Sequence, residues 1–77
     1  MVGARITSAR TEAGLTVEDL AHRTKIRASI LMAMEDDDFS ACGGDVYARG
    51  HLKGIASALG IDPAELLDLF DASLGGT

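Results

Sequence analysis

The stretch GLTVEDLAHRTKIRASILMAME at residues 14–35 decides the fold of this chain. The Thr16 hydroxyl is placed to accept a hydrogen bond from a free amide at the start of a new helix. Asp19, three residues later, completes a short-armed version of the capping box. Apolar residues then recur at helical spacing to the end of the stretch. The pattern predicts two short helices, at about 17–23 and 28–36, joined by a tight turn as a helix-turn-helix unit.

Three further helices are predicted around this unit, because each has its own start or stop signal. Gly14 and Gly60 are suited to the left-handed conformation that follows a helix end. Asp45 is expected to cap one helix start, and Asp62, which a proline follows, is expected to cap another. These helices are expected at residues 3–13, at about 46–59 and from residue 63 onward. The expected fold class is therefore all-α, a compact five-helix bundle.

Length and composition allow one small domain and exclude several classes of protein. A chain of 77 residues with one cysteine permits a modest core and no intramolecular disulfide. We expect the domain in residues 1–72, and a frayed tail or the start of a linker in residues 73–77. No apolar run is long enough to span a membrane. The net charge of -5 is unusual for a nucleic-acid-binding protein, which commonly has a basic face.

Neither a catalytic site nor a metal site is expected. His22 and His51 lack metal-ligand spacing with each other and with Cys42. The sequence has no glycine-rich phosphate loop. Nothing near Cys42 in the sequence marks its thiol as reactive. We therefore expect no enzymatic activity, no metal and no cofactor.

The helix at 28–36 suits DNA poorly, although the second helix of such a unit usually enters the major groove. Of its outward positions, only Arg27 and Ser29 are able to hydrogen-bond to base edges. The helix then runs into carboxylates, which repel phosphate. Arg23, Lys25 and Arg27 nevertheless cluster around the turn, as either a solvated surface or a contact to the DNA backbone. The alternative function is thus a DNA-binding regulator that uses these three cations and Ser29; the favoured expectation is weak DNA binding or none.

The predicted helix at 46–59 carries a second stripe beside its core-facing side. At 100° per residue, Tyr47, His51, Gly54 and Ala58 fall together on this stripe. In one interpretation Tyr47 and His51 are boundary residues, which bury a ring and keep a polar tip in water. In the other, the stripe is a partner-binding surface with an aromatic anchor beside small residues. A glycine within a helix costs roughly 1 kcal/mol relative to alanine, and a partner that approaches closely would account for it.

The chain resembles the RodZ-like branch of the Xre/Cro helix-turn-helix superfamily from about residue 3 to residue 70. The segment GLTVEDLA at 14–21 and KIRAS at 25–29 carry the resemblance to the superfamily. The segment GDVYARGHLK at 44–53, followed by ALGID at 58–62, is the most diagnostic of the RodZ-like branch. The resemblance implies an Xre/Cro-like helix-turn-helix within the five-helix bundle.

The same resemblance implies a function. RodZ-like domains are the cytoplasmic N-terminal parts of bacterial proteins that cross the membrane once, in a later segment. In that family the domain binds the actin-like protein MreB and links the cytoskeleton to cell-wall synthesis, through a fourth helix whose aromatic positions match Tyr47 and His51 here. We therefore expect a non-catalytic, cytoplasmic interaction adaptor without membrane contact of its own. Its expected partner is a protein of the MreB type or another cell-wall or division protein.

Three departures from the family pattern accompany this resemblance. An aromatic residue is usual where His51 stands, so the partner contact is expected to be weakened or altered. Leu-Pro is frequent where Cys42 and Gly43 stand, so this loop is expected to be looser. Glycine is frequent where Asp37 stands, so the helix end there is expected to form differently.

Overall fold

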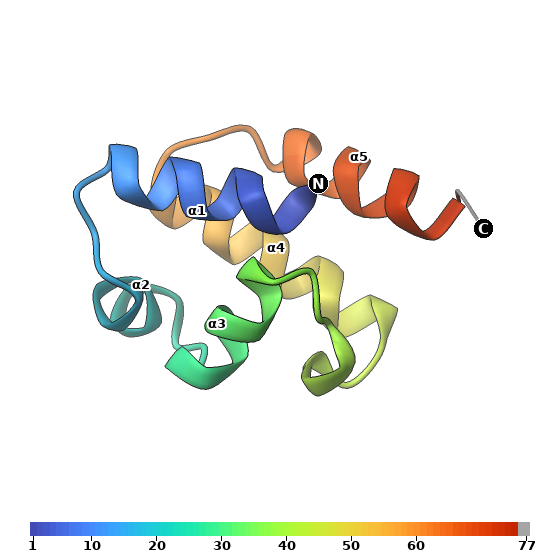
Figure 1. The fold of residues 1–77 in the computed structure, drawn as a ribbon, viewed down its shortest axis with the longest axis horizontal. Coiled ribbons are helices and arrows are strands. Elements are labelled where there is room, and N and C mark those ends of the chain that lie inside the picture. Colours follow the sequence, from blue (N-terminus) through green and yellow to red (C-terminus); the bar gives the residue numbers. More distant parts are fainter. Residues whose placement is uncertain (76–77) are drawn as a thin grey trace.

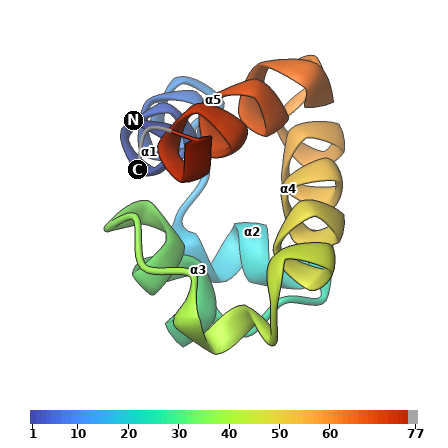
Figure 2. The same ribbon diagram turned by 90° about the vertical axis from the view of Figure 1, so that its right-hand side faces the viewer.

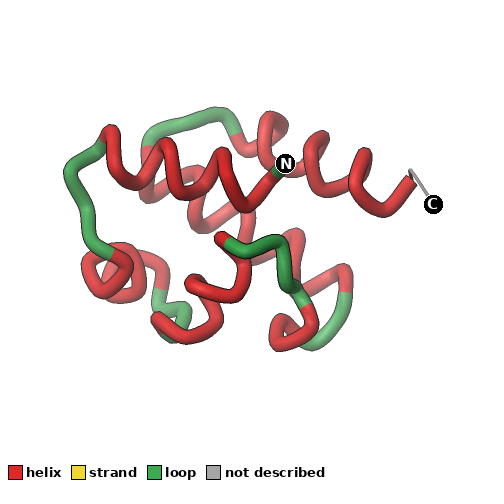
Figure 3. Tube along the Cα trace, viewed as in Figure 1, coloured by secondary structure: helices red, strands yellow, loops and turns green. Residues whose placement is uncertain are grey.

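Five α-helices and one short 3-10 turn make up the fold in a computed structural model, which describes the backbone of residues 1–75 and the side chains of residues 1–73. No strand occurs in that part of the chain, and the expected all-α five-helix bundle is confirmed (Figures 1 and 3). The elements are α1 (Val2–Glu12), α2 (Val17–Thr24), α3 (Ala28–Glu35), η1 (Ser40–Cys42), α4 (Asp45–Leu59) and α5 (Pro63–Gly75).

The helices surround one core. Figure 2 shows α4 along one side, with α1 and α5 above and the helix-turn-helix pair α2 and α3 below. Helix α4 contacts α1, α2 and α5, so it ties the two halves together. The fully buried apolar side chains come from every helix: Val2, Ile6, Leu20, Leu31, Met34, Leu52, Ile55 and Leu66. Burial of these side chains is the main term that stabilises a bundle of this size.

The helix-turn-helix unit begins as the sequence predicts. The Thr16 Oγ1 accepts from the Asp19 amide at 3.1 Å, and Asp19 Oδ2 accepts from the Thr16 amide at 3.0 Å, which completes the capping box. Gly14 and Gly60 are left-handed, with φ of 72° and 71°. Asp62 Oδ1 accepts from the Ala64 amide at 2.9 Å at the start of α5.

One expectation about a helix start is wrong. Asp45 does not cap α4, because Gly44 holds the cap position with φ of 123° and Asp45 is already the first helical residue. Helix α5 extends to Gly75, residues 76–77 of the expected tail lie outside the described part of the chain, and the domain boundary at residue 72 stays a prediction. The loop expected before α4 contains the turn η1, whose Cys42 is buried with 6% of its surface exposed.

Asp37 has a structural role just after the end of α3. Asp37 adopts the left-handed conformation that glycine favours, with φ of 62°. Its Oδ1 accepts a hydrogen bond from the Gly3 amide at 2.8 Å. Gly3 lies in the first turn of α1, where amides lack partners within the helix and the dipole favours a negative charge. Asp37 therefore serves as a cap for α1 supplied from a distant part of the chain.

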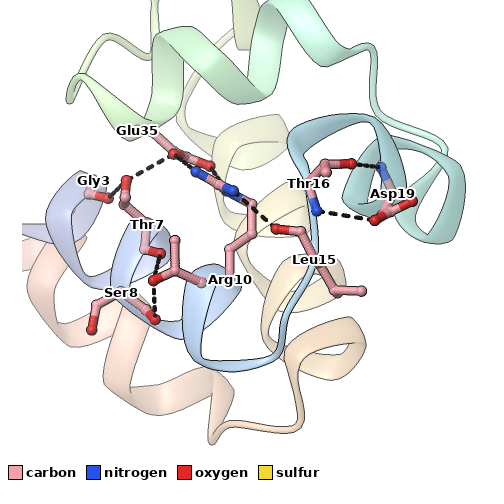
Figure 4. A network of polar contacts seen from close by, with 9 residues as sticks. Gly3, Thr7, Ser8, Arg10, Leu15, Thr16, Asp19 and Glu35 are labelled. Atoms are coloured by element: carbon pink, nitrogen blue, oxygen red, sulfur yellow. Dashed lines mark hydrogen bonds and ion pairs between the residues drawn. The ribbon is translucent and has the colours of Figure 1, made fainter.

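A charged network joins α1, α3 and the loop between α1 and α2 (Figure 4). Arg10 Nε and Nη2 donate to the two Glu35 carboxylate oxygens at 2.8 and 3.1 Å, and Arg10 Nη1 donates to the Leu15 carbonyl at 2.9 Å. The Thr7 hydroxyl donates to Glu35 at 2.8 Å. The hydrogen bond to Glu35 raises the pKa of Arg10. This bidentate pair fixes the helix-turn-helix unit against α1.

Candidate functional site

The structure places the predicted stripe on one face of α4, with its aromatic residue in solvent. Tyr47 is 65% exposed, so it does not bury its ring as a boundary residue would. His51 and Ala58 are half-buried, and Gly54 is exposed. The Tyr47 ring lies beside Gly43, where a methyl group added to the glycine would stand 3.6 Å from Tyr47 Cδ2. An exposed ring held at one end of a row of small residues is suited to anchor a partner.

The glycines of α4 face open space. A side-chain carbon added at Gly50 or Gly54 would meet no atom of the described chain within 4 Å. Packing within the domain therefore gives no reason for glycine at either position, although glycine weakens a helix. The close approach of a binding partner would account for glycine at these positions. Gly54 therefore stays in the candidate surface.

The opposite flank of α4 is held firmly against α5. The Arg49 guanidinium lies 5.6 Å from the centroid of the Phe70 ring and forms an ion pair with Asp71. The hydrogen bond to Asp71 raises the pKa of Arg49. Because α4 is anchored on this side, its Tyr47 stripe is presented on a rigid element.

The residues predicted for DNA contact lie around the turn between α2 and α3, with Arg23 in the last turn of α2 and Ser29 in the first turn of α3. Arg23, Lys25, Arg27 and Ser29 are all exposed. Lys25 ends α2 in a left-handed conformation with φ of 62°. None of the three cations forms an ion pair with a described residue. We call Arg23, Lys25 and Arg27 the basic turn.

Other features of α3 disfavour a DNA-reading surface. Met32, the exposed side chain farther along its outer side, is 57% exposed and apolar. The exposed carboxylates of Asp36, Asp37 and Asp38 follow at its C-terminal end. Phosphate would thus meet attraction at one end of α3 and repulsion at the other.

The structure forms a pocket beside α4 that no sequence pattern predicts. It has a volume of about 440 Å³ and lies where the segment after α3, the start of α4 and the end of α5 meet. Its lining includes the rings of Phe39 and Phe70, which are 4.9 Å apart edge to face, and the buried Ala48. Asp37 and Asp45 supply carboxylates. We call this feature the acidic pocket; the two phenylalanines, 31 positions apart, carry no sequence spacing that would reveal it.

The residues weighed for chemistry remain apart. No three metal-binding side chains gather among the described residues. Burial, followed by the charge of Asp38, raises the pKa of the Cys42 thiol, which makes it less reactive. Within the described residues, none of the helices has the length and apolar character needed to cross a membrane.

Comparisons with known proteins agree with this architecture. The helix-turn-helix domain family matches residues 5–66. The cytoskeleton protein RodZ of Streptococcus pneumoniae is 35% identical to the chain over 71 residues. That alignment covers 92% of this chain and 26% of the relative, so the chain spans about a quarter of the relative's length. No solved structure matches.

Proposed function

Because the chain belongs to the helix-turn-helix domain family and is a RodZ-like member of it, we propose that it is a non-catalytic adaptor for an actin-like cytoskeletal protein of the MreB type. The adaptor would link that filament protein to the machinery of cell shape or cell-wall synthesis. Its place would be the cytoplasm, at the inner membrane if a membrane segment follows in the native protein. The adaptor domain would occupy residues 1–72.

The exposed Tyr47 carries this proposal. A tyrosine ring offers a large contact area at little conformational cost, and its hydroxyl provides one hydrogen bond at the edge of an interface. Because the ring is 65% exposed, it contributes little to the core of the domain. Its burial by a partner would therefore add its exposed apolar area to the free energy of binding. His51, Gly54 and Ala58 extend the same face along α4.

His51 makes the proposed contact different from that of the wider family. A half-buried imidazole presents less apolar area than a phenol ring and adds a polar group that needs a partner. We therefore propose that the interface depends mainly on Tyr47. A divergent partner, such as another cell-wall or division protein, would suit the same face.

The test is a paired measurement on Tyr47→Ala and His51→Ala. Affinity is measured by co-sedimentation with filaments of the MreB-type protein from the same organism, and stability by thermal unfolding. We expect Tyr47→Ala to weaken binding by about 2 kcal/mol or more, or about thirtyfold, because anchor residues have effects of that size. The melting temperature should change little, since the ring is mostly in solvent.

Met32→Ala is the matched control. Met32 is an apolar side chain of α3 with similar exposure, so its loss should leave filament binding unchanged. Equal losses for Met32→Ala and Tyr47→Ala would place the interface on α3 or make it nonspecific. Unchanged binding in Tyr47→Ala would refute the proposed anchor.

DNA binding is the second candidate, and the free cations of the basic turn favour it. Arg23, Lys25 and Arg27, with Ser29 beside them, could contact a phosphate backbone. The two candidates differ in salt dependence, because neutralisation of phosphates gives a steep loss of affinity with salt and an aromatic anchor does not. Nanomolar binding to a selected DNA site at about 0.15 M salt would favour the regulator instead.

A further inference from the structure

Unpaired positive charge gathers at one place on this acidic chain. The sequence has seven lysines and arginines against twelve acidic residues. Three of the seven form ion pairs within the described chain: Arg5, Arg10 and Arg49. Of the four that pair with no described residue, only Lys53 lies outside the basic turn. The domain therefore presents free cations between α2 and α3, although its net charge is -5.

A second pocket lies at this turn, and its walls are both cationic and apolar. It has a volume of about 330 Å³ and is lined by Ala21, His22, Lys25, Ile26 and Arg27. Half-buried Ala21 and the edge of Ile26 contribute apolar surface. The aliphatic stems of Lys25 and Arg27 add to it, next to their charged ends. Among the described residues, none that lines it is acidic, and we call this feature the basic pocket.

This lining selects a ligand in which a carboxylate stands beside an apolar side chain. Lys25 and Arg27 attract the carboxylate, and a guanidinium is able to hold it with two parallel hydrogen bonds. The apolar side chain covers Ala21 and the aliphatic stems, and the area removed from water adds to the affinity. An acidic peptide segment with an apolar residue in it supplies both groups.

The length of α3 favours such a peptide over nucleic acid. A helix of eight residues rises about 12 Å, so Asp36, Asp37 and Asp38 follow about one helix length from Arg27. A duplex that takes α3 into its major groove runs past both ends of the helix and brings phosphates near those carboxylates. A short peptide contacts the basic end alone. Repulsion therefore opposes the duplex more than the peptide.

We propose that the basic pocket binds an acidic peptide segment of a second protein, with a carboxylate on Lys25 and Arg27 and an apolar side chain against Ala21. The pocket shares no residue with the Tyr47 stripe, so the proposal does not depend on what the stripe binds. An adaptor needs two surfaces to join two partners, and this pocket supplies the second. The contact is small and its charges are exposed, so its affinity is low.

Titration of the full chain, followed by nuclear magnetic resonance, tests the proposal. The probe is a hexapeptide of glutamates and aspartates with one central leucine, and a second peptide of equal charge has asparagine in place of the leucine. The amide signals of Lys25, Ile26 and Arg27 should shift and saturate with the first peptide in the millimolar range or below. The second peptide should bind about tenfold more weakly, because it lacks the apolar contact. Signals that stay in place with the leucine peptide, or equal affinities of the two peptides, would overturn the proposal.

Charge reversal separates the pocket from the rest of the turn. Lys25→Glu and Arg27→Glu should each weaken binding of the leucine peptide by about tenfold, since an attraction becomes a repulsion. Arg23→Glu is the matched control: it makes the same change in net charge within the same turn, but Arg23 does not line the pocket. Its effect should be about twofold or less, because salt screens charges that are not in contact. Equal losses for Arg23→Glu and Arg27→Glu would reduce the interaction to general charge attraction and refute the pocket.

Two further measurements keep the result independent of folding defects and of the stripe. A peptide with lysines in place of its acidic residues should bind Arg27→Glu more tightly than it binds the wild type, which requires a folded variant. Tyr47→Ala should leave affinity for the leucine peptide unchanged, so failure of this proposal and failure of the proposed anchor are distinguishable. A labelled DNA duplex that binds more tightly than the peptide at about 0.15 M salt would assign the turn to nucleic acid and overturn the proposal.

Discussion

At the residue scale, two helical glycines have opposite roles. Gly3 packs against the end of α3, and a side-chain carbon added there would lie 2.4 Å from the Glu35 carbonyl oxygen. Backbone atoms cannot easily move away, so Gly3→Ala should destabilise the fold by about 1–3 kcal/mol. Gly50→Ala adds the same methyl group in open space and should stabilise α4 by about 0.5–1 kcal/mol. Chemical denaturation of both variants measures the difference, and equal effects would show that α1 and α3 are not in close contact.

At the element scale, the Arg10–Glu35 pair is the main polar connection between α1 and α3. Its side chains are only 15% and 11% exposed, so removal of either partner leaves a largely desolvated charge. We expect Arg10→Met and Glu35→Gln each to cost about 2–3 kcal/mol, below the range for fully buried pairs. Denaturant unfolding of the single and double variants should show strong non-additivity. The exposed pair of Arg5 and Glu65 is the control, and its loss should have a much smaller effect.

Local signals predicted most elements, and contacts between distant residues supplied what the sequence did not reveal. The capping box at Thr16 and the proline after Asp62 act within a few residues, so a single sequence contains all the information they need. The cap that Asp37 gives to Gly3 joins residues 34 positions apart, and no spacing rule reports such a bond. The same difference explains the surfaces: the Tyr47 stripe follows from the period of one helix, whereas the acidic pocket requires three segments to meet.

Glu65 illustrates the limit of local rules within one element. It stands three residues after Asp62, in the position of a capping-box residue, yet its carboxylate pairs with Arg5 of α1. In place of the hydrogen bond that a capping box makes within one helix, Glu65 forms an ion pair that joins α5 to α1.

At the scale of the whole molecule, stability should be lost in acid. Hydrogen bonds from the Thr16 and Ser40 backbones and hydroxyls hold the pKa of Asp19 and Asp38 below the ordinary value of 3.8. A carboxylate whose pKa is lower in the folded than in the unfolded chain stabilises the fold at pH values above its unfolded-state pKa. This contribution to stability disappears as the pH falls through the folded-state pKa. The melting temperature should therefore be steady between about pH 7 and 5 and fall below about pH 4.

Asp19→Asn checks the origin of this acid sensitivity. The amide retains an acceptor for the Thr16 amide and loses the titrating charge. The gap in melting temperature between wild type and variant should narrow as the pH falls below about 4. A gap that is constant with pH would exclude Asp19 as a source.

The buried thiol of Cys42 can be used to report local opening of the domain. Cys42 sits in η1, between α3 and α4, and its thiol is shielded while that turn stays docked. A thiol-specific reagent therefore reacts only in molecules where the turn has opened. The labelling rate thus measures how often the turn opens. Because η1 leads into α4 near the acidic pocket and Tyr47, a ligand that binds either surface and keeps the turn docked should slow the labelling of the Cys42 thiol. Ligand binding can thus be read as chemical protection at a site that the ligand never touches.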